Sequence, residues 1–191
     1  MRCFVAIDLS PDVRAALEDE CERLRAVAPR ADARWVRVAG MHLTLKFLGE
    51  VPEDIMPGIR NSLAVATAAT PPIALACAGL GMFPGPSRPR VVWAGITDGL
   101  QELGLLAAAV ERAVEPFGFA PERRPFRGHV TLARVRSPRG VRLLARAVEV
   151  AGHVPFGSWS ASHVVLYRSR LHPTGAVYEA LVTLPLAGVV A

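Results

Sequence analysis

Apolar and polar residues along the chain follow two periods, one typical of strands and one typical of helices. Alternation with a period of two marks strands, whose successive side chains point to opposite faces. Apolar residues spaced three and four apart mark helices, and Ser10 followed by Pro11 is a favourable N-cap and first helical position. The first part of the chain predicts strand, helix, strand, helix and strand, over residues 2–9, 11–27, 41–49, 53–68 and 73–83.

The remainder of the chain repeats this order of elements after a turn at residues 84–89, which is rich in proline and glycine. Asp98 is the expected N-cap of the next helix, and the pair Ser137 and Pro138 is the expected start of the last helix. A further strand is expected at the chain's end. The predicted elements are strands and helices over residues 90–97, 98–114, 128–135, 137–148, 162–170 and 177–185.

Two of the predicted strands carry nearly the same motif. Residues 41–49 read MHLTLKFLG and residues 128–135 read GHVTLARV, so that His129 follows His42 by 87 positions. The same offset aligns the apolar strand starts at residues 4–5 and 91–92 without a gap. Two matched units of this length predict a duplication rather than a solenoid, and hence one domain over residues 1–191 made of two pseudo-symmetric lobes.

The paired motifs suit chemistry at phosphorus. Residues i and i+2 of a strand share a face, so His42 projects with Thr44 and His129 projects with Thr131. Packing of the two copies about a pseudo-two-fold axis would bring all four side chains into one cleft. One neutral imidazole could then deprotonate a nucleophile while the other, protonated, supplies a proton to the leaving oxygen. The threonine hydroxyls could donate to the phosphate oxygens.

Composition limits the class of protein. The chain has 191 residues, 51% of them hydrophobic and 20% charged, which is typical of a globular domain. No apolar run is long enough to span a bilayer, and the N-terminus reads as a first strand rather than a signal peptide. Three cysteines without a CxxC pair indicate neither a disulfide framework nor a zinc site. A cytoplasmic protein without a membrane partner is expected.

The charge is positive and carried by arginine. The net charge is +5, and every basic residue except Lys46 is an arginine, whose planar guanidinium suits phosphate. An Ala- and Arg-rich chain can also result from GC-rich codons. This origin explains the total number of arginines better than it explains their clustering. The clustered arginines favour an anionic partner and salt-sensitive binding; they are Arg123, Arg124, Arg127, Arg134, Arg136, Arg139, Arg142 and Arg146.

Other chemistries have weaker support in the sequence. Neither motif has a second histidine or a carboxylate at metal-ligand spacing, and no G-x-S-x-G elbow is present. Phe47 stands where the second copy has Arg134, and either core packing or stacking on a base would suit it. The same choice holds for Phe4. Core positions are expected for Trp93 and Trp159, surface or turn positions for His153 and His163, and a place at the rim of the cleft for His172.

The two motifs and their flanking segments resemble those of a known family. HLTLKFLGE and HVTLARV, with FVAIDLS at the start and RVVWAG between them, are similar to the LigT-like branch of the 2H phosphoesterases. This branch is also called the 2′-5′ RNA ligase family. The resemblance covers residues 4 to about 178. It implies a bilobal α+β fold in which two antiparallel sheets line a central cleft and helices lie outside.

The resemblance also implies an activity and roles for particular residues. Family members open RNA 2′,3′-cyclic phosphates to 2′-phosphates without a metal or cofactor. By position, His42 would be the proton donor and His129 the proton acceptor that activates water. Thr44, Thr131 and Arg134 would hold the phosphate. Arg134 lies five residues after His129, so strict alternation points it to the opposite face unless a bulge intervenes.

Several alternatives remain open at the level of sequence. Family members commonly have proline before the second histidine, whereas this chain has Gly128, which should loosen the backbone there. The same acid and base could also join 2′-5′ ends or open a small cyclic nucleotide. A non-catalytic RNA-binding module could use the same basic cleft. No obligate protein partner is indicated, and a monomer acting on RNA or oligonucleotide ends is the leading expectation.

Overall fold

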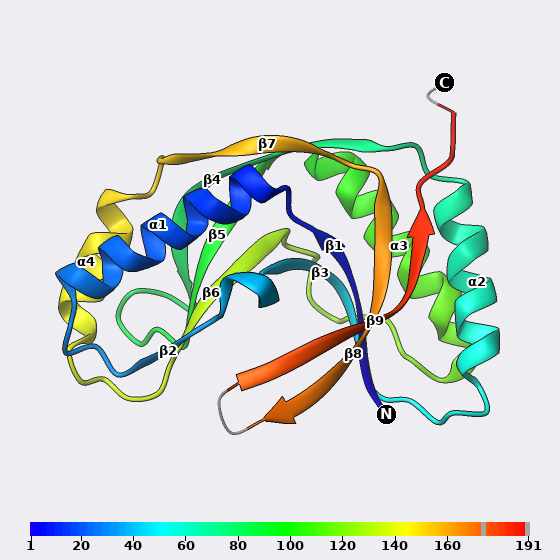
Figure 1. The fold of residues 1–191 in the computed structure, drawn as a ribbon, viewed down its shortest axis with the longest axis horizontal. Coiled ribbons are helices and arrows are strands. Elements are labelled where there is room, and N and C mark those ends of the chain that lie inside the picture. Colours follow the sequence, from blue (N-terminus) through cyan, green and yellow to red (C-terminus); the bar gives the residue numbers. More distant parts are fainter. Residues whose placement is uncertain (173–174, 190–191) are drawn as a thin grey trace.

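The protein is an α+β domain in which one curled antiparallel sheet carries helices on its outer side (Figure 1). A computed structural model describes residues 1–172 and 175–189. The strands within these residues are β1 (Arg2–Asp8), β2 (Ala33–Trp35), β3 (His42–Glu50), β4 (Ile73–Phe83), β5 (Val91–Asp98), β6 (His129–Val135), β7 (Pro155–Ala161), β8 (His163–His172) and β9 (Gly175–Pro185). The helices are α1 (Pro11–Val27), α2 (Met56–Ala68), α3 (Leu100–Val114) and α4 (Val141–Val150), with 3₁₀ turns η1 (Val38–Gly40) and η2 (Glu115–Phe117).

The sheet is continuous, with the strand order β7-β4-β5-β6-β3-β1-β8-β9, and β2 pairs with β6 beside β3. The expectation of two separate sheets is therefore wrong. The two halves of the sheet meet through β3 and β6, which are joined at the pair Leu43 and Val130. A short junction of this kind bends the sheet without interrupting it. Figure 1 shows β4 and β5 on one side of the bend and β1, β8 and β9 on the other.

The helices pack on the two halves of the sheet in pairs. In Figure 1, α1 and α4 lie at the left of the molecule, and α2 and α3 lie at the right. Their apolar stripes enter one hydrophobic core, in which Leu17 of α1, Leu63 of α2, Leu106 of α3 and Leu144 of α4 are almost completely buried. The helices therefore cover one face of the central strands and leave the opposite face uncovered by helices.

The order of elements predicted from the sequence is confirmed, and several boundaries are not. Ser10 caps α1 as expected, since its Oγ accepts a hydrogen bond from the Val13 amide at 3.3 Å. The predicted cap at Asp98 is wrong, because Asp98 still belongs to β5 and Gly99, at a φ of 72°, precedes α3. Two predicted helix starts are early, because α2 begins at Met56 and α4 at Val141. Strands β2 and β7 were not predicted.

Candidate active site

The four side chains singled out by the repeated motif lie together on one face of β3 and β6. These neighbouring antiparallel strands pair at Leu43 and Val130, which are equivalent positions in the two copies of the motif. This register places His42 across from Thr131, and Thr44 across from His129. Each histidine therefore faces the threonine of the other copy. This surface is called the histidine face below.

Both imidazoles are held by the same backbone contact. The Nδ1 atom of His42 lies 2.8 Å from the carbonyl oxygen of Gly40, and that of His129 lies 2.8 Å from the carbonyl oxygen of Arg127. A carbonyl can only accept, so Nδ1 carries the hydrogen in each ring. The Nε2 atom of each imidazole is left for chemistry, and it can accept a proton or donate one.

A β-bulge at the same place in both copies reorients the residue five positions after each histidine. Strand β1 pairs Val5 with Lys46 and Ala6 with Thr44, which skips Leu45. Strand β5 pairs Val92 with Ala133 and Trp93 with Thr131, which skips Leu132. Positions 45 and 132 differ by the repeat offset of 87.

The bulge explains how Arg134 can lie on the same face as His129, although strict alternation would place it on the opposite face. Val91, opposite Arg134, shares a strand face with Trp93 and Gly95, which are opposite Thr131 and His129. Arg134 therefore returns to the histidine face, where it is exposed. The same bulge in the first copy brings Phe47 onto this face, and Phe47 is 58% exposed. Phe47 is therefore not packed in the core, and its ring lies where a ligand could contact it.

His42 lies among aromatic rings contributed by distant parts of the chain. Phe4 stacks on its imidazole with the ring centroids 4.6 Å apart, and Tyr178 meets it edge-on at 5.1 Å. Phe4 also stacks on Tyr167, whose hydroxyl donates a 2.7 Å hydrogen bond to Asp8. Phe4 is buried, and its ring forms the support of His42 rather than a surface for a base.

Burial has a strong effect on the charge of His42. Desolvation lowers the pKa of His42 to about 4, although the hydrogen bond to Gly40 and the negative charge of Asp8 oppose this change. His42 is consequently neutral at pH 7 in the ligand-free protein. A positive charge on His129 also lowers the pKa of His42, as burial does, because the two imidazoles lie close together.

His129 has a different aromatic neighbourhood. Phe83 meets its imidazole edge-on at 5.1 Å, and Trp93 lies 6.5 Å away between ring centroids. Trp93 is half-buried and its indole packs over Gly81, where an added Cβ atom would overlap the ring. The prediction that Trp93 is a core residue is therefore wrong, whereas Trp159 is half-buried and packs against the hydrophobic core.

Two residues of the histidine face escaped the sequence analysis. Arg34 of β2 pairs directly with Arg134, which places two guanidinium groups on neighbouring strands. Tyr178 of β9 reaches His42, and Arg134 is near enough for its positive charge to oppose the rise that burial causes in the pKa of Tyr178. Arg34 precedes the first motif by only a few residues but reaches this face through the pairing of β2 with β6, and Tyr178 lies on β9, so no local pattern could have revealed them.

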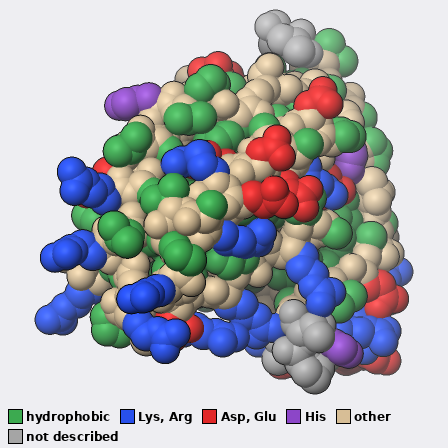
Figure 2. Space-filling view, turned by 60° about the vertical axis from the view of Figure 1, so that its left-hand side comes forward, with side chains coloured by type: hydrophobic (Ala, Val, Ile, Leu, Met, Phe, Trp, Pro, Cys, Tyr) green, Lys and Arg blue, Asp and Glu red, His purple; other side chains and the backbone are tan. Residues whose placement is uncertain are grey.

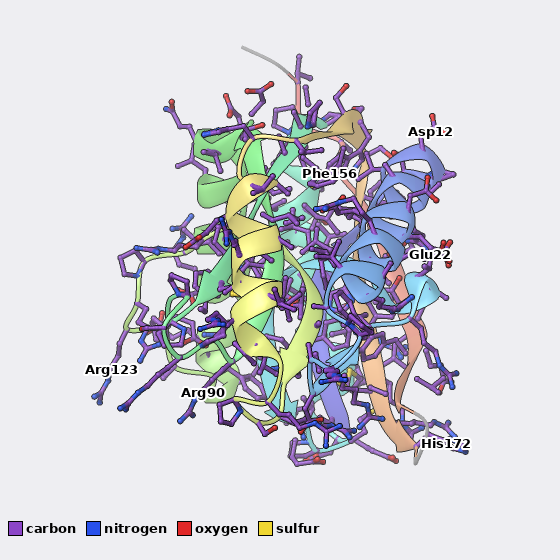
Figure 3. All side chains as sticks on the ribbon, turned by 90° about the vertical axis from the view of Figure 1, so that its left-hand side faces the viewer. Asp12, Glu22, Arg90, Arg123, Phe156 and His172 are labelled. Carbon is purple, nitrogen blue, oxygen red and sulfur yellow. The ribbon has the colours of Figure 1, made fainter. Side chains whose placement is uncertain are left out.

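The arginine cluster of residues 123–146 does not form one patch. Arg134 lies on the histidine face, whereas Arg123, Arg124 and Arg127 belong to the loop before β6. Lys46 fixes the start of this loop. Its buried Nζ atom donates to the carbonyl oxygen of Ala120 at 2.7 Å and to Glu111 at 3.0 Å. Figure 3 shows Arg123 projecting from the lower left side of the molecule.

Gly128, directly before β6, fits tightly against Ile96 of β5 and Leu103 of α3. A Cβ atom at this position would lie 2.8 Å from Leu103 of α3, and the Gly128 carbonyl accepts a hydrogen bond from the Ile96 amide at 3.3 Å. The bond and the close packing hold the backbone at this point. The expected loosening of the backbone before His129 stays a prediction.

The remaining histidines and the cysteines lie elsewhere. His153 is exposed after α4, His163 lies 3.7 Å from Asp8, and His172 is exposed at the end of β8. All three cysteines are buried and free. In residues 1–172 and 175–189, no group of three or more His, Cys, Asp or Glu side chains is placed to hold a metal ion. No helix there has the length and apolar character needed to cross a membrane.

Comparisons with known proteins agree with this geometry. The profile of the family described as LigT like Phosphoesterase matches residues 7–93 and 96–178. The chain belongs to the LigT-like phosphoesterase family. An RNA 2′,3′-cyclic phosphodiesterase of Aeropyrum pernix is 40% identical over 73% of this chain and 78% of its own length. Another from Methanothermobacter thermautotrophicus is 33% identical over 93% and 95% of the two chains.

Solved structures of the family share the fold. A Thermus thermophilus protein superposes with a TM-score of 0.79 at 32% identity, over 98% of this chain and 99% of its own. Escherichia coli LigT complexed with 3′-AMP superposes with a TM-score of 0.70 at 27% identity, over 97% of each chain. The curled sheet with its four helices is therefore the architecture of the family.

Proposed function

We propose that the protein hydrolyses RNA or oligonucleotide 2′,3′-cyclic phosphate ends to 2′-phosphomonoesters. The observation that supports this most directly is the pair of imidazoles held through Nδ1 by equivalent carbonyls, each opposite a threonine hydroxyl. Binding of an anion alone requires positive charge and hydrogen-bond donors. Two oriented groups that can each accept or donate a proton suit general acid–base catalysis.

The proposed reaction is an in-line displacement in which His129 is the base and His42 is the acid. Nε2 of His129 takes a proton from water as the water oxygen forms its bond to phosphorus. The bond between phosphorus and O3′ breaks on the opposite side, and Nε2 of His42 gives its proton to O3′. The phosphate stays on O2′, and proton exchange with solvent restores both imidazoles.

Three side chains of the histidine face would hold the phosphate in this reaction. The hydroxyls of Thr44 and Thr131 flank the line between the two imidazoles and can donate to the non-bridging oxygens. Arg134, returned to this face by the bulge, can offer two parallel donors to the same oxygens. Phe47, on the exposed side of Phe4 at a centroid distance of 6.0 Å, is placed to stack on a base.

Because the pKa of His42 is low, the bound substrate must raise it before His42 can act as a proton donor. An acid with a pKa of about 4 is almost entirely unprotonated at pH 7, so the free protein holds His42 in the wrong state for a donor. The negative charge of a bound phosphodiester favours the imidazolium and raises this pKa. We infer that His42 gains its proton together with the substrate.

We also infer that the domain is a duplication whose two units exchange strands. The strand order is symmetric about β3 and β6, with β4 of the first unit beside β5 of the second and β8 of the second unit beside β1 of the first. The equivalent bulges, the equivalent Nδ1 contacts and the two ranges matched by the family profile support this inference. Two lobes would then face each other across the histidine face.

The proposed setting is a monomer in the cytoplasm. One chain contributes both imidazoles and both threonines, so catalysis needs no second copy. Three buried cysteines without disulfide partners suit a reducing compartment.

A short RNA that ends in a 2′,3′-cyclic phosphate tests the proposal, with EDTA present and the product isomer identified. A 2′-phosphate product that forms at the same rate with and without EDTA is expected. A 3′-phosphate product would reverse the assigned leaving group. Turnover of mononucleotide cyclic phosphates alone, or joining of ends without hydrolysis, would replace RNA hydrolysis as the function.

A further inference from the structure

A groove rich in arginine lies beyond the end of β6, outside the histidine face. It runs between the β4–β5 turn and one side of α4, and its walls include Pro86, Pro89 and Val141. Five arginines line it, all of them exposed: Arg88, Arg90, Arg136, Arg142 and Arg146. It is called the α4 groove below. Figure 2 shows basic side chains gathered along the left and lower parts of that view.

The charge of the α4 groove is not balanced from within the protein. Glu149 is the one acidic residue among the described side chains that line it. In the part of the chain that the structure describes, no carboxylate lies within 4.0 Å of any of the five guanidinium groups. A concave surface with this much unpaired positive charge concentrates polyanions.

The groove adjoins the end of β6 that carries Arg134, because Val135, the last residue of this strand, is part of its lining. Arg136 follows Arg134 by two positions, and the Arg90 carbonyl accepts a hydrogen bond at 2.9 Å from the amide of Val135, the residue between them. A chain whose terminal phosphate meets His129 and Arg134 thus finds the next basic side chains at the start of the groove. Figure 3 shows Arg90 at the lower left of the molecule, close to the start of α4.

We propose that the α4 groove binds the phosphodiester backbone of the RNA several nucleotides before its cyclic phosphate end. This inference rests on the proposed function, because it takes the histidine face as the place of the RNA terminus. The groove presents guanidinium groups and only apolar or small side chains besides Glu149, so it contacts phosphates rather than reading bases. The protein would therefore prefer oligonucleotides to mononucleotides.

The test compares a 12-nucleotide RNA ending in a 2′,3′-cyclic phosphate with the corresponding mononucleotide 2′,3′-cyclic phosphate. In Arg142→Gln/Arg146→Gln, the ratio of kcat/KM for the 12-mer to kcat/KM for the mononucleotide should fall about tenfold, since two exposed ion pairs are removed. Arg112→Gln is the matched control, because Arg112 is an exposed arginine near the end of α3. This variant should leave the ratio unchanged.

Binding without turnover separates this inference from the proposed function. Fluorescence anisotropy of a labelled 12-mer with a 3′-hydroxyl end should show weaker binding by Arg142→Gln/Arg146→Gln. The slope of log Kd against log salt concentration should decrease by about 1.4, because each ion pair with a single-stranded phosphate contributes about 0.7 to this slope. This result would stand even if wild type failed to open the cyclic phosphate.

Three results would overturn the inference. The first is a ratio of kcat/KM values that the double variant leaves unchanged. The second is a length preference that disappears in Arg123→Gln/Arg124→Gln instead, which would place the RNA on the loop before β6. The third is binding to anionic lipid vesicles that the double variant abolishes while its RNA binding stays unchanged, which would assign the groove to a membrane surface.

Discussion

The backbone has the same geometry around His42 and around His129, whereas the neighbouring side chains differ. In both, a carbonyl two residues earlier accepts from Nδ1, and a bulge three residues later returns the fifth residue to the same face. Beyond this, His42 is enclosed by Phe4, Tyr167 and Tyr178, whereas His129 is followed by Arg134. The backbone therefore holds the two imidazoles in equivalent ways, and the residue that the bulge returns to this face, Phe47 in one half and Arg134 in the other, makes the first half apolar and the second cationic at that position.

Among residues other than the two histidines, the largest effect is expected from Arg134, the residue that the second bulge returns to this face. Arg134→Gln removes the charged donor that we propose for the phosphate and should lower kcat/KM for the cyclic phosphate about 10- to 100-fold. Steady-state kinetics with Arg112→Gln as the control measures this change. If Arg134→Gln behaves like the control, Arg134 is an ordinary surface arginine and the phosphate lies elsewhere on the face.

The threonines should give a smaller and more equal effect. Thr44→Val and Thr131→Val each remove one hydroxyl donor and keep the shape of the side chain, so each should lower kcat/KM about tenfold. Equal losses would support a phosphate held between the two copies of the motif. A loss confined to one variant, measured under identical conditions, would show that the phosphate sits on one copy only.

The residue after the first bulge tests the apolar half. Phe47→Ala should lower kcat/KM about fivefold for substrates with a base next to the phosphate, because it removes the ring that we propose to stack on the base. The melting temperature should change little, since this side chain is largely exposed. Equal catalytic losses with ribose 2′,3′-cyclic phosphate, which lacks a base, would contradict stacking.

The smallest expected effect concerns the charge beside His42. A general acid must be protonated, so the rate falls as pH rises through its pKa. Asp8 favours the imidazolium and thereby raises the pKa of His42 against the effect of burial. Asp8→Asn should move this alkaline fall to lower pH by about half a unit, measured in the profile of kcat/KM against pH. A shift to higher pH would assign the limb to another group.

The sequence predicted what depends on local pattern. Alternation around each H-x-T motif placed the histidine and threonine of each copy on one face, and the offset of 87 related the two strands. The bulges could not be predicted, because they arise from the pairing of β3 with β1 and of β6 with β5. For the same reason Arg34 and Tyr167 were missed, since each reaches the site by pairing between strands distant in sequence, and Tyr178 was missed because its ring meets His42 from β9.

Other errors have similar physical causes. Trp93 looked like a core residue because large aromatic side chains are usually buried, yet the absence of a side chain at Gly81 gives the indole a place beside His129. The cap at Asp98 was predicted from residue preference, whereas Gly99 adopts the positive φ that the turn into α3 requires. Strand β7, which contains a proline, a glycine and two serines, lacks a strong pattern of its own.

The most direct test of the account measures the two histidines singly and together on an RNA with a 2′,3′-cyclic phosphate end. His42→Ala and His129→Ala should each lower kcat about 10²- to 10⁴-fold, while His153→Ala should match wild type. Because the acid and the base act in one displacement, the double variant should be little slower than the slower single variant. Wild-type rates in either folded single variant would contradict the claim that both imidazoles transfer protons in the reaction.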